Sequence, residues 1–129
     1  NMGIVILIVL IAAFVWLVVK LNNASIKKVL ESNRIFRPFD DRLHERPEQQ
    51  ARIKRSLKEN MEIKLMAPNK YCGEVIGMTG NEYTVSLEYC SCLDFKDRHK
   101  PCKHMYYFAR KSGRCTIEKV GEKYLIRKI

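Results

Sequence analysis

Residues 90–104 read CSCLDFKDRHKPCKH and contain four potential metal ligands in two closely spaced pairs. One residue separates Cys90 from Cys92, and Cys102 and His104 repeat this spacing after a nine-residue loop. Side chains two residues apart on an extended chain point to the same side, so each pair can offer two ligands to one ion. Structural zinc takes four sulfur or nitrogen ligands in a tetrahedron. The stretch therefore predicts one Zn²⁺ ion bound by all four residues.

The second pair also predicts where a helix begins. Because residues two apart on a regular helix do not share a face, we expect Cys102 to precede the helix and His104 to lie in its first turn. The helix would continue through residues 105–111 and end at Gly113. Three cysteines and one histidine leave no open coordination position, which predicts a structural ion and not a catalytic one.

These residues resemble a SWIM-type zinc finger, whose pattern is Cys-x-Cys, a variable loop and Cys-x-His. Ser91, the pair Asp94-Phe95 and Pro101 match accessory features of that family, whereas His99-Lys100 stands where many members have a glycine. The resemblance covers about residues 83–110. It implies a strand–zinc–helix fold and a role in binding DNA or protein.

The first part of the chain predicts a transmembrane helix over residues 3–21. Gly3–Val19 has no charged or strongly polar side chain, and as a helix it would span about 26 Å. Lys20 can extend its amine to the lipid headgroups, and Trp16 lies where an interfacial aromatic residue is expected. A domain this small cannot cover a helix that is apolar all round, which disfavours a buried core helix.

Positive charge follows the apolar segment and does not precede it, which disfavours a secretory signal peptide. Whether the helix is retained or cleaved stays open. By the positive-inside rule the domain after the helix faces the cytoplasm, where a reducing environment also keeps zinc-binding thiols free. The basic residues that carry this argument are Lys20, Lys27, Lys28, Arg34 and Arg37.

Beyond the helix, we expect a basic juxtamembrane linker over residues 22–46 and a small domain over residues 47–129. Pro47 can start a helix that continues through residues 48–60. Alternating patterns and turn residues then predict strands over 61–66, 71–78 and 83–89, the last running into Cys90, and a closing hairpin of 115–120 and 124–129. The predicted fold is a small zinc-stabilised α+β domain with antiparallel strands and short helices, preceded by one N-terminal transmembrane helix.

Cysteines and histidines outside the predicted metal site give no sign of catalysis. Cys72 and Cys115 are either reduced thiols or a disulfide, and the sequence leaves both possibilities open. A nucleophilic cysteine needs a neighbouring base, and only His44 and His99 remain, both expected at the surface. We therefore expect no enzyme and no small-molecule substrate.

The net charge is +10, from 24 basic and 14 acidic side chains. This excess has two interpretations: it favours binding of an anionic partner, or it only sets the membrane topology and keeps the domain soluble. The run Tyr106-Tyr107-Phe108 could stack on unpaired bases, but we expect at least two of these rings to pack in the core. We expect a membrane-anchored, cytoplasmic-facing, zinc-binding interaction module that binds nucleic acid or protein. The alternative is an adaptor that recruits an acidic protein to the membrane without binding nucleic acid. The candidate partner-binding residues are Lys96, Arg98, Lys100, Lys103 and Arg110.

Overall fold

A computed structural model describes residues 1–32, 34–36 and 38–129, and for residues 25–32 it describes the backbone alone. The chain forms two units, Asn1–Asn33 and Arg34–Ile129. The second unit begins at Arg34, so it includes part of the segment that the sequence predicted as a linker.

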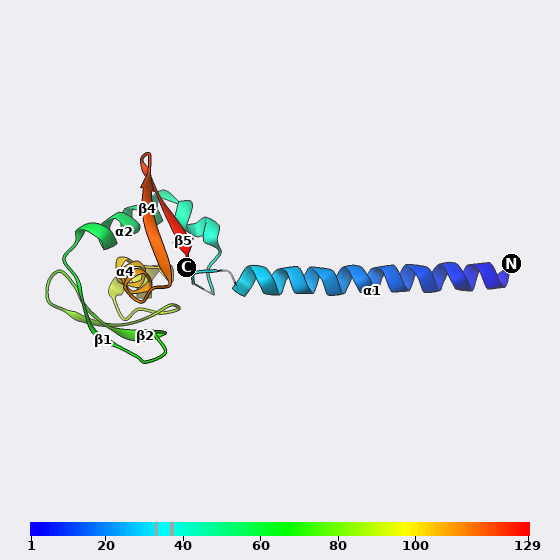
Figure 1. The fold of residues 1–129 in the computed structure, drawn as a ribbon, viewed down its shortest axis with the longest axis horizontal. Coiled ribbons are helices and arrows are strands. Elements are labelled where there is room, and N and C mark those ends of the chain that lie inside the picture. The colour runs from blue at the N-terminus through cyan, green and yellow to red at the C-terminus, as the bar shows by residue number, and fades with distance from the viewer. Residues whose placement is uncertain (33, 37) are drawn as a thin grey trace. The chain divides into compact units, whose positions relative to one another are not determined.

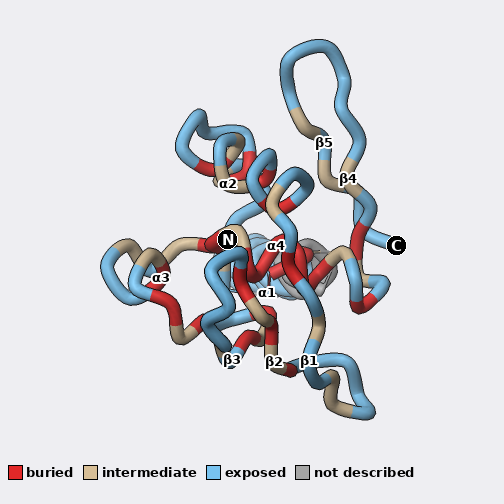
Figure 2. The backbone as a smooth tube through the Cα atoms, turned by 90° about the vertical axis from the view of Figure 1, so that its left-hand side faces the viewer, coloured by how far each residue is buried: buried red, intermediate tan, exposed pale blue. Residues whose placement is uncertain are grey.

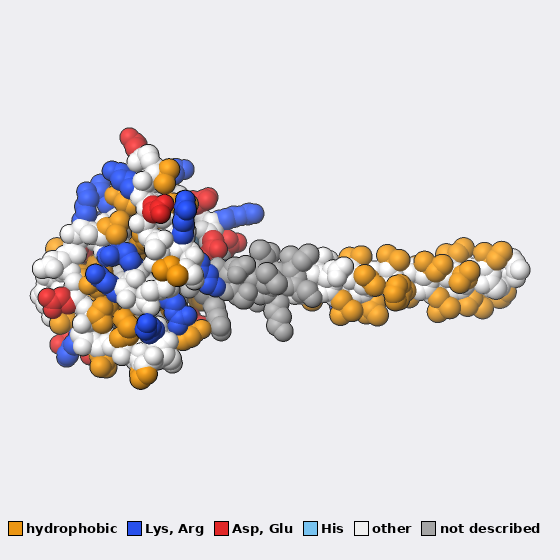
Figure 3. Space-filling model, viewed as in Figure 1, with side chains coloured by type: hydrophobic (Ala, Val, Ile, Leu, Met, Phe, Trp, Pro, Cys, Tyr) orange, Lys and Arg blue, Asp and Glu red, His pale blue; other side chains and the backbone are white. Residues whose placement is uncertain are grey.

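The first unit consists of helix α1 (Met2–Ser32). Within it, Met2–Ala24 is long and apolar enough to cross a membrane, with a mean hydropathy of 3.2. Hydrophobic side chains line this part of the helix in Figure 3. The side chains of Lys27 and Lys28, and all of Arg37, lie outside the described residues, so three of the five charges used to predict orientation have no structural description.

The second unit has helices and antiparallel strands, which confirms the predicted α+β class (Figure 1). Strands β1, β2 and β3 form one sheet in that order, and β4 and β5 form a separate hairpin. The closing hairpin therefore does not pair with the strand that leads to the metal ligands. The elements are η1 (Asp41–Glu45), α2 (Pro47–Lys58), β1 (Glu62–Met66), β2 (Cys72–Ile76), β3 (Glu82–Ser86), α3 (Leu93–Arg98), α4 (Lys103–Lys111), β4 (Cys115–Val120) and β5 (Lys123–Lys128).

Helix α4 lies at the centre of this unit and is buried along most of its length (Figure 2). The three-stranded sheet packs on one side of α4, and α2 and the β4–β5 hairpin pack on the other (Figure 1). Tyr106, Tyr107 and Phe108 are all buried, so all three aromatic rings belong to the core. None of them is available for stacking on a base.

Gly73 allows β2 to approach its neighbours closely. A Cβ atom at this position would clash with the carbonyl oxygen of Leu65 on β1 and would lie 2.9 Å from Cε2 of Phe108 on α4. The register of β1 also shifts here, between Ile63 and Leu65. The absence of a side chain at Gly73 therefore sets the distance between the sheet and α4.

Part of the predicted linker packs into the core around Tyr106. The ring of Phe36 is fully buried and meets the ring of Tyr106 edge-on, with centroids 5.5 Å apart. The prediction that His44 is a surface histidine was wrong, because His44 is buried and its Nδ1 lies 2.6 Å from the hydroxyl of Tyr106. Burial lowers the pKa of His44, because a buried site disfavours the charged form of the ring.

Candidate metal centre

The first two ligands lie on a segment that returns beside β3. The prediction that the strand runs through Tyr89 into Cys90 was wrong: β3 ends at Ser86, whose Oγ accepts the N–H groups of Glu88 and Tyr89. These hydrogen bonds reverse the chain, because a serine hydroxyl can replace a backbone acceptor in a tight turn. Cys90 then pairs with Val85 in an isolated bridge.

The nine-residue loop contains the short helix α3, which sequence reasoning missed. Cys92 caps this helix, and its Sγ accepts the N–H of Phe95 at 3.4 Å. The helix ends at His99, which adopts a left-handed conformation with φ 52°. An acid in the first turn, Asp94, and a base in the last, Arg98, are typical of a helix and could have indicated it.

The second pair of ligands has the predicted placement. Cys102 is the N-cap of α4, and His104 lies in the first turn of this helix. Because Cys102 has an extended backbone, its side chain and that of His104 can both reach the returning segment. Sequence spacing alone was sufficient for this prediction.

The four ligand atoms form one buried cluster. The Sγ atoms of Cys90, Cys92 and Cys102 and a ring nitrogen of His104 all lie within 4.8 Å of one another. The Nδ1 atom of His104 is 3.8 Å from Sγ of Cys90 and 3.7 Å from Sγ of Cys102. In a tetrahedral zinc site, the usual bond lengths separate sulfur from nitrogen by about 3.6 Å and sulfur from sulfur by about 3.8 Å. The donor set therefore fits one tetrahedral metal ion.

The three thiols influence one another because they are in contact. Hydrogen bonds from Cys102 and Cys90 lower the pKa of Cys92, which becomes the most acidic of the three. Contact with Cys90, then with Cys92, together with burial, raises the pKa of Cys102. Three thiolates packed this closely repel one another, so a divalent cation is needed to keep all three ionised.

Tyr83 supports the His104 ring. The two ring centroids are 4.3 Å apart and the planes are inclined by 33°, so the rings are roughly stacked. Gly77 lies beside them: a Cβ atom there would be 3.0 Å from Cε2 of Tyr83 and 3.4 Å from Nε2 of His104. The sheet thus holds the histidine in place through an aromatic contact and a glycine.

A buried glutamine connects α2 to the metal-binding loop. Nε2 of Gln49 donates to the carbonyl oxygen of Pro101 and to the hydroxyl of Tyr106, both at 2.9 Å. Its Oε1 accepts a hydrogen bond from Nη1 of Arg98 at 3.0 Å. Gln49 is fully buried, yet nothing in the sequence distinguishes it from a surface residue of a polar helix.

Asp94 makes a second connection between the same elements. Its carboxylate binds Arg52 of α2 at 2.8 Å and Arg98 of its own helix at 2.9 Å. Hydrogen bonds from Arg52, then from Arg98, lower the pKa of Asp94 to about 2. The loop that carries the ligands is therefore fixed to α2 by both neutral and charged contacts.

The predicted partner-binding residues do not form one free basic surface. Lys96 is exposed and Lys100 is half-buried. Lys103 forms an ion pair with Glu59 at 2.6 Å. The other two also make internal contacts, since Arg98 binds Asp94 and Gln49, and Arg110 donates to the carbonyl oxygen of Ser56.

The two cysteines outside the cluster are both free. Cys72 is exposed, whereas Cys115 is buried, and burial raises the pKa of the Cys115 thiol to about 11. A disulfide between them, one of the alternatives left open by the sequence, is not formed. Cys115 is a protonated thiol that packs in the core at neutral pH.

No protein-family model, curated protein sequence or solved structure matches this chain. The metal centre is therefore assigned from its own residues and their geometry. The resemblance of residues 83–110 to a SWIM-type finger stays a prediction from the sequence.

Proposed function

We propose that this protein is a membrane-anchored, zinc-binding interaction module. The observation that carries the proposal is the cluster of three cysteine sulfurs and one histidine nitrogen, all buried and within 4.8 Å of one another. Zinc is the ion that thiolate and imidazole ligands in a tetrahedron favour. Since the protein would supply all four ligands, the ion has a structural role, and the rest of the surface is left for a partner.

The metal would contribute directly to folding. The ligands come from the segment beside β3, the N-cap of α3 and the first turn of α4, and an ion joins these three elements at one point. In small domains the free energy of metal binding is largely free energy of folding. Removing the ion is therefore expected to unfold the second unit.

The test measures zinc in the full chain, purified in detergent without added metal. We expect one zinc per chain, and loss of both zinc and cooperative unfolding in Cys102→Ser. Cys72→Ser is the matched control, because it makes the same change at an exposed cysteine outside the cluster. A folded wild-type chain without metal, or equal loss in both variants, would refute the zinc centre.

The apolar segment Met2–Ala24 supports a membrane anchor, and the basic residues after it support a cytoplasmic domain. Cys72 offers a direct test of orientation because it is the exposed cysteine of the domain. In sealed vesicles of known orientation, a membrane-impermeant maleimide should label Cys72 only from the cytoplasmic face. Labelling from the opposite face would refute this topology, and recovery of the chain in the soluble fraction would refute the anchor.

The partner is an anionic macromolecule, nucleic acid or protein, because the chain carries a net charge of +10. One observation favours the second candidate, an adaptor that recruits an acidic protein to the membrane: Tyr106, Tyr107 and Phe108 are buried and cannot stack on bases. Binding of labelled single-stranded DNA and of an acidic protein, each measured over a series of salt concentrations, separates the two. Tight DNA binding with a steep salt dependence would exclude the adaptor.

A further inference from the structure

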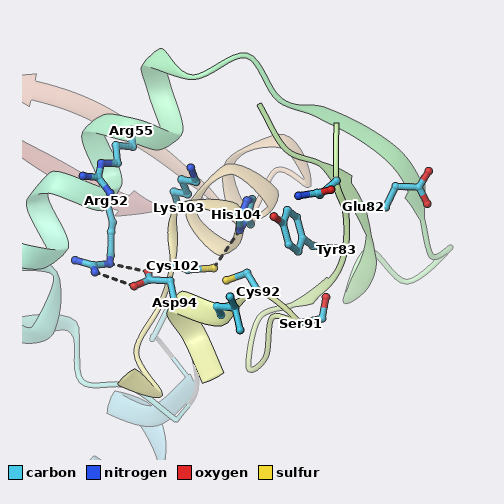
Figure 4. A pocket seen from close by; sticks show the side chains of 12 residues that line it. Arg52, Arg55, Glu82, Tyr83, Ser91, Cys92, Asp94, Cys102, Lys103 and His104 are labelled. Carbon is cyan, nitrogen blue, oxygen red and sulfur yellow. Dashed lines mark hydrogen bonds and ion pairs between the residues drawn. The ribbon is translucent and has the colours of Figure 1, made fainter. Parts of the chain in front are cut away.

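A cleft of about 610 Å³ lies between α2 and the edge of the three-stranded sheet, and three of the four candidate metal ligands form part of its lining. Figure 4 shows Arg52 and Arg55 of α2 on one side, Glu82 and Tyr83 of β3 on the other, and His104 between them. The cleft is lined by charged, polar and apolar groups, and its residues also include Asn81, Ser91, Cys92, Leu93, Asp94, Cys102 and Lys103.

One wall of the cleft is the edge of β3. In an antiparallel strand, alternate residues direct both their N–H and their C=O toward the same neighbour. The N–H of Thr84 donates to the side-chain Oγ of Ser91, and its carbonyl oxygen accepts the N–H of Ser91. Ser86 donates its N–H to the carbonyl oxygen of Tyr89, so the backbone groups of both residues face away from β2. Glu82 is next in this series, and its N–H and C=O therefore face the same outer edge.

The returning segment covers only the second half of this edge. It bridges Val85 through Cys90 and stops short of Glu82. Among the residues that the structure describes, none accepts from or donates to the outward backbone groups of Glu82. A strand edge of this kind can bind another extended chain through main-chain hydrogen bonds.

The charges around the cleft leave one cation without a counter-charge. The acids beside the cleft are already neutralised: Asp94 by Arg52 and Arg98, and Glu82 by Lys64 at 2.7 Å. Arg55, on the wall opposite β3, is exposed and forms no ion pair within the described part of the chain. An acidic side chain of a bound molecule would supply the missing partner.

Leu93 adds an apolar contact at the same place. Leu93 lines the cleft at the start of α3, and the residue is 76% exposed. An open strand edge, an unpaired arginine and an exposed leucine together suit an extended peptide with alternating acidic and apolar residues. A nucleic acid would make no use of the strand edge.

We propose that this cleft binds an extended acidic peptide segment of a partner protein, which adds to the edge of β3 at Glu82 and places an acidic side chain against Arg55. The inference rests on the proposed function of the domain as an interaction module and names the class of its partner. It also explains why the metal ligands lie beside the binding edge, since the ion fixes β3 relative to α3 and α4.

The probe is a fluorescent peptide of alternating glutamate and valine, titrated onto the zinc-loaded full chain in detergent. Arg55→Glu should weaken binding at least about tenfold, because it replaces a charge attraction with a repulsion. Lys58→Glu is the matched control: it makes the same charge change on the same helix, outside the cleft residues, and should have little effect. Zinc content is measured for every sample, so that an unfolded variant is recognised.

Two further peptides test the strand edge, with the backbone N-methylated at the glutamates in one and at the valines in the other. At least one should lose binding, because methylation removes the N–H that pairs with the carbonyl oxygen of Glu82. The amide of Glu82 should also exchange more slowly with solvent when the unmodified peptide is bound.

Each other outcome overturns the inference. Equal weakening by Arg55→Glu and Lys58→Glu would mean nonspecific charge attraction, and undiminished binding of both methylated peptides would exclude the strand edge. If the zinc-loaded wild-type chain binds an oligonucleotide but not the peptide, the cleft inference fails while the metal-binding module stands. If the chain holds no zinc, the proposed function itself fails.

Discussion

Replacement of Gln49 by leucine tests the connection between α2 and the metal-binding loop. The change removes two neutral hydrogen bonds, to Pro101 and Tyr106, and one from the guanidinium of Arg98. At about 1 kcal/mol for each neutral bond and about 2 kcal/mol for the charged one, the gross loss is roughly 4 kcal/mol. Burying a leucine returns part of this, roughly 2 kcal/mol.

The net expectation for Gln49→Leu is a loss of about 2 kcal/mol in the free energy of unfolding. The former partners keep other contacts, since Tyr106 still binds His44 and Arg98 still binds Asp94. They are not left as unpaired buried groups, which keeps the cost moderate. For a domain of this size the melting temperature should fall by roughly 8–16 °C.

Gln50→Leu is the matched control, because it makes the same change at the next residue. Gln50 also makes three hydrogen bonds, but they go to the backbone of His44 and Tyr124, not to the metal-binding loop. Thermal unfolding of the zinc-loaded full chain measures stability, and competition with a chelator measures zinc affinity. We expect both variants to be less stable and only Gln49→Leu to hold zinc more weakly.

Two results would refute this reasoning. If Gln49→Leu unfolds within about 0.5 kcal/mol of the wild type, the buried hydrogen bonds contribute nothing net. If Gln50→Leu weakens zinc binding as much as Gln49→Leu, the effect is one of general stability and not of the connection to the loop.

Three further predictions follow from single residues. Gly73→Ala should lower the free energy of unfolding by about 1–3 kcal/mol in a denaturant titration, and Gly77→Ala, with looser contacts, should lower it less; equal effects would contradict the described packing. Burial lowers the pKa of His44, so the imidazole binds a proton more readily in the unfolded chain than in the folded one. The neutral His44 is therefore compatible with the fold above pH 6.5, and protonation favours unfolding as the pH falls below 6.5. His44→Phe should therefore flatten the dependence of stability on pH below 6.5, and an unchanged profile would contradict the lowered pKa of His44. The ion pairs with Arg52 and Arg98 lower the pKa of Asp94, so its carboxylate stabilises the fold at every pH above the unfolded value of 3.8. Asp94→Asn should therefore unfold at a lower denaturant concentration than the zinc-loaded wild type at neutral pH, and equal stability would show that the ion pairs contribute nothing net.

Local chain geometry explains why much of the fold could be predicted. The segments that form β1 and β3 alternate apolar and polar residues in the sequence, and the turn between β2 and β3 uses a positive φ at Gly80. The start of α4 followed from the spacing of Cys102 and His104, because two residues on a regular helix cannot face one ion. Each of these features depends on neighbours a few residues apart.

The sequence predictions were wrong or incomplete where a side chain accepts a hydrogen bond from a backbone N–H group. The strand expected to reach Tyr89 ends at Ser86, because the hydroxyl of Ser86 accepts two backbone N–H groups and turns the chain. α3 was missed because its cap is Cys92, which the sequence presents only as a metal ligand. Cys92 both caps α3 and belongs to the metal-binding cluster, and the spacing of the cysteines indicates only the second role.

By itself the sequence predicted the cluster of three cysteines and one histidine that fits a metal ion, the apolar N-terminal helix and most of the strands. Residue spacing, the length of an apolar run and the alternation of apolar and polar residues are all properties of short segments. The tertiary structure alone decided that His44 and Gln49 are buried on the hydroxyl of Tyr106 and that the edge of β3 stays open beside Arg55. Gln49 and Tyr106 are 57 residues apart, and the periodicity of a sequence cannot predict a contact between residues so far apart. Polar residues can be buried only where the fold supplies a hydrogen-bond partner, and that partner is fixed when the segments pack.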